Sequence, residues 1–211
     1  MQTKKYSLIY ADPGWSYRDS ADDGNRGACH KYTTMSVEDI CRLPVWDLAA
    51  PDCLLAMWWV PTMPEEALMV MRMWGFRLAT MKGFTWHKTT RAGNTKLGMG
   101  HYTRANTEDC LFAVRGRWAG RRLDAGISQF ITAPIREHSR KPDEAADRLV
   151  QLVGDVPRVE LFARAARPGW DVWGNEAPGS ISLPGSIAVP GHRENNAAKV
   201  FAGARTAGGH V

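Results

Sequence analysis

The sequence predicts an α/β protein built around a mostly parallel sheet. Short β-branched and aromatic runs alternate along the chain with segments of helical periodicity, which is the pattern of strand–helix–strand units. The run Cys53–Val60 (CLLAMWWV) is continuously apolar, as expected of a strand buried on both faces of such a sheet. With 211 residues, 44% of them hydrophobic and 23% charged, the chain has enough apolar material for one sizeable core.

Local signals then place the individual strands and helices. Strands are predicted at Tyr6–Ala11, Cys53–Val60, within Phe76–Lys88, at Asp109–Arg115, at Val159–Ala163 and beginning at Trp170–Trp173. Helices are predicted from Ser36, whose side chain can cap the first turn, at Met63–Trp74 and at Pro142–Val153. The polar or Gly-rich segments Ser20–Tyr32 and Thr89–Ala105 are predicted to be loops.

The composition of the chain changes near residue 177, and its other features argue against a membrane, secreted or metal-binding protein. Gly, Pro, Ser and Ala dominate from Ala177 to Val211, so we expect one domain at 1–176 and a flexible tail at 177–211. No run approaches 18 apolar residues and no signal peptide opens the chain, so we expect no membrane contact and a cytoplasmic protein. The four cysteines lack metal-ligand spacing, which predicts reduced thiols and no metal site.

Charge and aromatic content favour a polyanionic partner. Lys and Arg outnumber Asp and Glu by 27 to 22, giving a net charge of +5. The nine tryptophans exceed the need of a core of this size, so some could stack on a base, although packing is the better interpretation of any single one. The basic cluster at Arg115, Arg117, Arg121 and Arg122 fits a solvated loop and a phosphate-binding patch about equally.

The tetrapeptide Asp12-Pro13-Gly14-Trp15, at the end of the first predicted strand, can carry chemistry on an adenine amine. That nitrogen is a poor nucleophile because its lone pair is delocalised into the ring. A carboxylate on Asp12 and the carbonyl of Pro13 could each accept one N–H and free the lone pair, while Trp15 could stack on the base. Taken alone, the turn is better explained as a structural device that caps a helix or ends a sheet.

Four further segments follow in a specific order. They are Gly83-Phe84-Thr85-Trp86-His87-Lys88-Thr89, then Gly98–Arg104 with Glu108–Leu111, then His138–Glu144, and finally Val159–Arg164 running to Gly174-Asn175-Glu176. With the turn, this ordered set resembles the methyltransferase family that includes the messenger-RNA adenosine methyltransferase catalytic subunit and many phage and bacterial adenine methyltransferases. The resemblance covers roughly Tyr6 to Glu176.

The resemblance implies a Rossmann-like methyltransferase fold with a permuted motif order, and S-adenosylmethionine as the cofactor. It implies that Asp12, Pro13 and Trp15 are catalytic. It assigns cofactor contacts to Asp12, Lys88, Arg164, Asn175 and Glu176, with Lys88 meeting the carboxylate of the cofactor. It assigns substrate contacts to Gly14, Tyr17, His101, Tyr102, Arg104 and Asn106.

The expected activity is methylation of the exocyclic amino group of adenine in nucleic acid, with DNA favoured over RNA. The base must be flipped out or already unpaired, because a duplex hides that nitrogen. Gly14 replaces the second Pro of the usual turn, and Glu176 stands where a Gln is common. The alternatives are a catalytically silent nucleic-acid-binding subunit and a methyltransferase for RNA, a small molecule or a protein amide. Monomer and homodimer both remain open.

Overall fold

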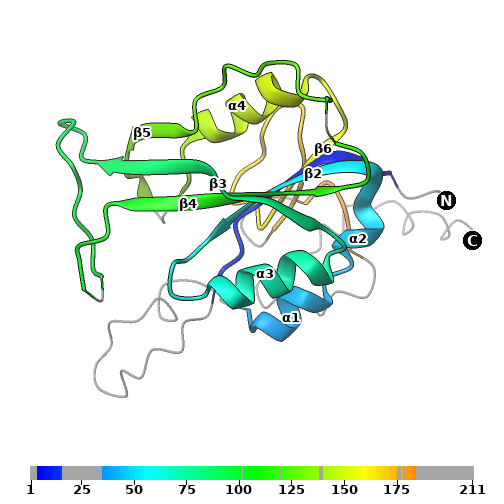
Figure 1. The fold of residues 1–211 in the computed structure, drawn as a ribbon, viewed down its shortest axis with the longest axis horizontal. Coiled ribbons are helices and arrows are strands. Elements are labelled where there is room, and N and C mark those ends of the chain that lie inside the picture. The colour runs from blue at the N-terminus through cyan, green and yellow to red at the C-terminus, as the bar shows by residue number, and fades with distance from the viewer. Residues whose placement is uncertain are drawn as a thin grey trace, which may run out of the picture.

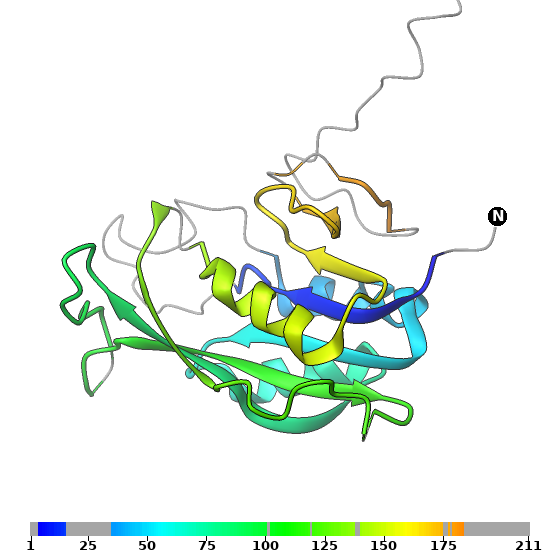
Figure 2. The same cartoon turned by 90° about the horizontal axis from the view of Figure 1, so that it is seen from above.

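A sheet with helices on both faces forms the framework of the protein, as Figures 1 and 2 show. The computed structural model describes residues 4–15, 35–100, 102–118, 120–137, 140–174, 177 and 179–183. The strands are β1 (Tyr6–Ala11), β2 (Ala49–Trp59), β3 (Arg77–Thr89), β4 (Thr107–Arg115), β5 (Phe130–Pro134), β6 (Arg158–Leu161) and β7 (Asp171–Trp173). The helices are α1 (Val37–Arg42), α2 (Val45–Leu48), α3 (Pro64–Met73) and α4 (Asp143–Val153).

The strand order in the described residues is β5-β3-β4-β2-β1-β6-β7. Pairing is parallel for β1 with β2 and β6, for β6 with β7 and for β3 with β5, whereas β4 is antiparallel to both β2 and β3. All the strands except β4 therefore run in one direction. Their carboxyl ends meet at one edge, which is where ligands bind in sheets of this type.

Successive apolar side chains of a central strand point to opposite faces of the sheet, and each face carries a hydrophobic core. Ile9 and Ala11 of β1 face α1 and α3, whereas Leu8 and Tyr10 face α4. Figure 1 shows α1 and α3 below the sheet and α4 above it. The period-two pattern of a strand explains how one segment fills both layers.

The predicted fold class is confirmed, and the predicted elements agree with the structure to within a few residues. Ser36 caps α1 as expected, its Oγ accepting a hydrogen bond from the Asp39 N–H at 3.1 Å. Two short elements, α2 and β5, were not predicted. β5 is a strand of 5 residues that, among the described strands, pairs with β3 alone, and so short a strand carries little local signal.

Some residues after the predicted boundary at 176 contact the sheet and the core. The Ser180 N–H donates to the Val172 carbonyl at 2.9 Å, and Leu183 is 4% exposed within the core beside α1 and α3. These residues cover β7 because an edge strand leaves main-chain groups unpaired. The folded domain thus extends at least to Leu183. Within the described residues, no helix is long and apolar enough to cross a membrane.

Candidate active site

The Asp12-Pro13-Gly14-Trp15 turn lies at the carboxyl edge of the sheet, immediately after β1. The Asp12 N–H lies 3.5 Å from the carbonyl oxygen of Leu161 in β6, so the turn begins between two parallel strands. The Trp15 N–H donates to the Pro13 carbonyl at 2.9 Å, and the Met35 N–H donates to the Gly14 carbonyl at 3.2 Å. The Pro13 oxygen retains a second lone pair for another donor.

Trp15 holds this turn from inside the core. Its ring is 6% exposed, and its Nε1–H donates to the Trp58 carbonyl at 3.2 Å. The side chain packs in the core beside α1 and α3 and is absent from the lining of the pocket that contains Asp12. Burial of the Trp15 indole thus helps to fix the turn, and stacking of Trp15 on a base stays a prediction.

A chain of ion pairs runs from Asp12 across the sheet. Lys141 Nζ lies 3.0 Å from Asp12 Oδ1 and 3.1 Å from Glu108 Oε2, and Lys88 Nζ lies 3.3 Å from Glu108 Oε1. The Lys141 side chain is only 13% exposed, and its ammonium lies 5.5 Å from the centre of the Trp58 ring. The ends of β1, β3 and β4 and the segment before α4 thus position four alternating charges.

Burial and these ion pairs shift the pKa values of Asp12, Glu108 and Lys141. Burial raises the pKa of Asp12, although Lys141 opposes the change. Burial also disfavours the charged form of Glu108, but Lys141 and Lys88 outweigh it and lower the pKa of Glu108. The pKa of Lys141 is raised because Asp12 and Glu108 overcome its own burial. Lys141 is therefore held as a cation.

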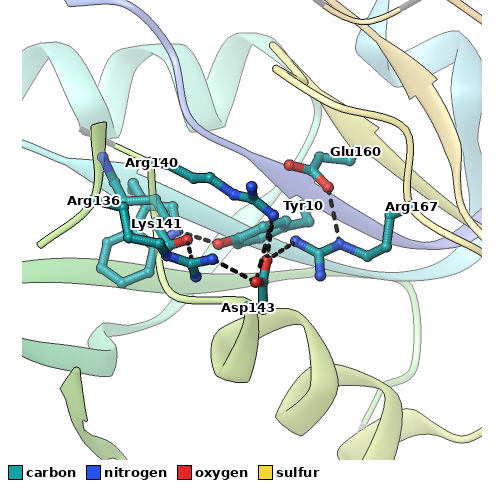
Figure 3. A network of polar contacts seen from close by, with 8 residues as sticks. Tyr10, Arg136, Arg140, Lys141, Asp143, Glu160 and Arg167 are labelled. Carbon is teal, nitrogen blue, oxygen red and sulfur yellow. Dashed lines mark hydrogen bonds and ion pairs between the residues drawn. The ribbon is translucent and has the colours of Figure 1, made fainter. Parts of the chain in front are cut away.

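Asp12 opens into a pocket of about 220 Å³ at the carboxyl ends of β1 and β6. Figure 3 shows part of its lining, in which charged side chains from β6, the segment after it and the start of α4 converge. The lining residues are Tyr10, Asp12, Arg140, Lys141, Asp143, Glu160, Phe162, Arg164, Ala165, Ala166, Arg167 and Pro168. The mixture of carboxylates and cations suits a ligand that carries both signs of charge.

Asp143, the first residue of α4, anchors three arginines on this side of the pocket (Figure 3). Its carboxylate lies 2.6 Å from Arg136 Nη1, 3.1 Å from Arg140 Nη2 and 3.1 Å from Arg167 Nη2. Although burial opposes ionisation, these hydrogen bonds lower the pKa of Asp143 to about 2. Arg167 also pairs with Glu160 at 3.4 Å, which ties α4 to β6.

The structure brings only some of the predicted site residues together. Asp12 and Arg164 line the same pocket. Lys88 lies in a neighbouring pocket and is linked to Asp12 through Glu108 and Lys141, so among the described residues Lys141 is the lysine that contacts Asp12.

The remaining predicted residues lie on loops or outside the described part of the chain. Tyr102 and Arg104 are exposed on the β3–β4 connection, and the Asn106 carbonyl accepts a hydrogen bond from the Lys88 N–H at 2.8 Å. Tyr17, His101, Asn175 and Glu176 fall outside the described residues.

Sequence reasoning missed the roles of Lys141 and Glu108. Both belong to segments that contributed to the resemblance, and each has a local signal: Lys141 lies just before a helix, and Glu108 opens a buried strand. Their mutual contact joins two segments on either side of β5, which no local pattern reveals.

Comparisons with known proteins agree with this geometry. A profile described as MT-A70 matches residues 6–176. The "Type II methyltransferase M.MunI" of Mycoplasma sp is 30% identical over 198 residues, which cover 86% of this chain and 82% of that protein. The human "N(6)-adenosine-methyltransferase catalytic subunit METTL3" is 26% identical over 83% of this chain, and the human "N(6)-adenine-specific methyltransferase METTL4" is 26% identical over 82%. The chain spans 29% and 38% of these two longer proteins.

Proposed function

Because the chain belongs to the MT-A70 family, we propose that it methylates the exocyclic amino group of adenine in nucleic acid, with S-adenosylmethionine as the donor. The observation that carries this proposal is the Asp12 carboxylate at the end of β1, paired with a buried lysine and opening into a charged pocket. M.MunI, most of which this chain covers, is named a methyltransferase, and METTL4 is named adenine-specific.

The two oxygens of Asp12 have different tasks in this proposal. Oδ1 contacts Lys141 at 3.0 Å, so we assign Oδ2 to the substrate. Oδ2 would accept one N–H of the adenine amine while the Pro13 carbonyl accepts the other. Two acceptors on one amine draw the nitrogen towards tetrahedral geometry and make its lone pair available.

The pocket residues fit the cofactor by their chemistry. When bound, S-adenosylmethionine supplies a methyl group attached to a positively charged sulfur. Its carboxylate would meet Lys141 and Arg164, whereas Glu160 would accept hydrogen bonds from its ammonium or hydroxyl groups. Lys141 takes the role that the resemblance assigned to Lys88, because Lys141 is the lysine that lines the pocket. Water can remove the proton from the methylated amine, so no dedicated base is required.

We favour DNA as the substrate, with the adenine flipped out or unpaired. The chain is 30% identical to the type II methyltransferase and 26% identical to the protein named for adenosine. A cytoplasmic location, expected from the sequence, is consistent with access to nucleic acid.

Mass spectrometry of nucleosides tests the proposal directly. Single-stranded and duplex DNA and RNA of matched sequence would be incubated with the protein and S-adenosylmethionine, then digested. N6-methyladenine should accumulate in DNA with the wild-type chain, and Asp12→Asn should reduce the rate by at least about 100-fold. Lys82→Gln, an exposed substitution outside both pockets, serves as the control. Undiminished methylation by Asp12→Asn would contradict the mechanism.

A further inference from the structure

A second pocket, next to the one that contains Asp12, has a cationic lining that the proposed chemistry does not use. Its volume is about 190 Å³, and its lining residues are Trp86, Lys88, Lys96, Gly98, Glu108, Ile135 and Arg136. Three of these are cations and one is a carboxylate. Glu108 also faces Lys141 of the first pocket, so two lysines already neutralise its charge.

Main-chain hydrogen bonds hold in place the backbone segments that carry the three cations. The Lys96 N–H donates to the Lys88 carbonyl at 2.8 Å, which places the two lysines side by side at the base of the β3–β4 connection. The Ile135 N–H donates to the Thr89 carbonyl at 2.9 Å and fixes the start of the segment that carries Arg136. Backbone segments that are ordered before binding reduce the entropy lost when an anion binds.

The cations retain capacity for another acceptor. Lys88 has one ion-pair partner, Glu108, although an ammonium has three donors. Lys96 is exposed and has no ion pair within the described residues. Arg136 uses Nη1 on Asp143 and Nη2 on the Lys141 carbonyl at 3.2 Å, so it contributes mainly its charge. Lys88 is paired with Glu108 and Arg136 with Asp143, so among the described residues Lys96 supplies the positive charge of this pocket that no carboxylate balances.

We infer that this second pocket binds a phosphodiester group of the substrate strand, close to the adenine held at Asp12. A lysine is a point charge that suits a phosphate oxygen, and phosphate contacts fix the register of a nucleic acid without reading its sequence. This inference rests on the proposed function, and it gives Lys88 a substrate role in place of a cofactor role. The neighbouring pocket would thus position the strand while the first pocket holds the reacting groups.

Salt-dependent binding of a single-stranded oligonucleotide tests the inference. The variants are Lys96→Glu, an exposed change that should not affect folding, and Lys88→Gln/Lys96→Gln. Each should weaken DNA binding roughly tenfold at low salt, and the slope of log K against log salt should become shallower by about 0.7 for each phosphate that the variant no longer neutralises. RNA of the same sequence should show the same change of slope, because the two backbones share the phosphodiester. Lys82→Gln, on the same strand as Lys88 and outside both pockets, should change neither quantity.

Calorimetry with S-adenosylhomocysteine separates this inference from its alternatives. If the inference is correct, the variants bind S-adenosylhomocysteine as tightly as the wild type does. An unchanged salt slope, or a weaker affinity for S-adenosylhomocysteine with oligonucleotide binding intact, would overturn it. If the wild-type chain transfers no methyl group but the slopes still differ, the proposed function fails and the phosphate site stands. If it methylates adenine and the slopes are the same, only the phosphate site fails.

Discussion

The ion pair between Asp12 and Lys141 makes the protonation state of the Asp12 carboxyl group depend on the Lys141 ammonium. In the proposed mechanism the ionised carboxylate of Asp12 is the stronger acceptor for an amine, yet burial favours the protonated form and raises the pKa of Asp12. Lys141 opposes that effect at 3.0 Å. Glu108 in turn keeps Lys141 charged and directed to the turn. The protonation state of Asp12 therefore depends on Lys141 directly and on Glu108 through Lys141.

Replacing Lys141 should shift the acid limb of the pH–rate profile. Without the ammonium, the pKa of Asp12 rises further, so kcat/KM should begin to fall at a pH about one unit higher in Lys141→Met than in wild type. Lys141→Arg keeps the charge and should restore most of the original profile. The measurement is kcat/KM for methyl transfer from mildly acidic to mildly alkaline pH. An acid limb that stays in place in Lys141→Met would contradict this assignment.

Asp143 makes a different, structural contribution because three arginines hold it ionised. Its pKa is lowered to about 2 from a usual value of 3.8, so its stabilisation is fully present above that usual value and is lost as the pH falls towards 2. Its side chain is 38% exposed, so solvent screening reduces the effect.

Asp143→Asn should lower the free energy of unfolding by about 1 kcal/mol at neutral pH. The deficit relative to wild type should shrink near pH 2, since the wild-type carboxylate then approaches its own titration. Urea unfolding at both pH values measures the difference. Asp147→Asn, an exposed carboxylate on the same helix, is the matched control. An equal deficit at the two pH values would show that ionisation is not the cause.

At the scale of elements, the packing of the antiparallel strand β4 against β3 requires a glycine at position 83 of β3. A Cβ on Gly83 of β3 would lie 2.2 Å from the Phe112 ring of β4, and that ring packs edge-on against Phe84 with centroids 5.0 Å apart. The register of the β3–β4 pair also shifts between Thr80 and Phe84. The aromatic ring thus occupies the space that any side chain at position 83 would need.

Gly83→Ala should therefore destabilise the fold by about 1–3 kcal/mol through overpacking. In a Phe112→Ala background the same substitution should cost much less, because the ring that it meets is gone. A double-mutant cycle of unfolding free energies measures this coupling. Additive effects of the two substitutions would rule out the steric explanation.

At the scale of the whole molecule, strands from distant parts of the sequence and the segment after β7 complete one domain. Ser180 bonds to Val172 of β7, and Leu183 is buried in the core beside α1 and α3. The composition of the chain changes at residue 177, before these contacts, so composition alone does not reveal them. Burial of the Leu183 side chain stabilises the packing of this segment on the domain.

Truncation should locate the carboxyl-terminal boundary of the domain. A chain that ends after Leu183 should unfold within about 2 °C of the full-length protein, whereas a chain that ends after residue 176 should lose roughly 2–3 kcal/mol, or about 5–10 °C, because it lacks Leu183 and the cover of β7. Differential scanning calorimetry compares the two. Equal midpoints for both truncations would show that this segment contributes no stability.

The sequence by itself determined the alternation of strands and helices, the turn at Asp12 and the ordered segments that mark the family. These features are local: they depend on periodicity, capping and turn residues, or on motif order along the chain. Only the tertiary structure decided that β4 is reversed, that Phe130–Pro134 is a strand and that Trp15 is buried.

The tertiary structure also decided that Lys141, not Lys88, contacts Asp12. That contact requires β1, β4 and the segment before α4 to meet at one edge of the sheet. The sequence signals each of these segments separately, but the distance between two charges depends on how distant strands pair and pack, which the residues next to either charge do not specify.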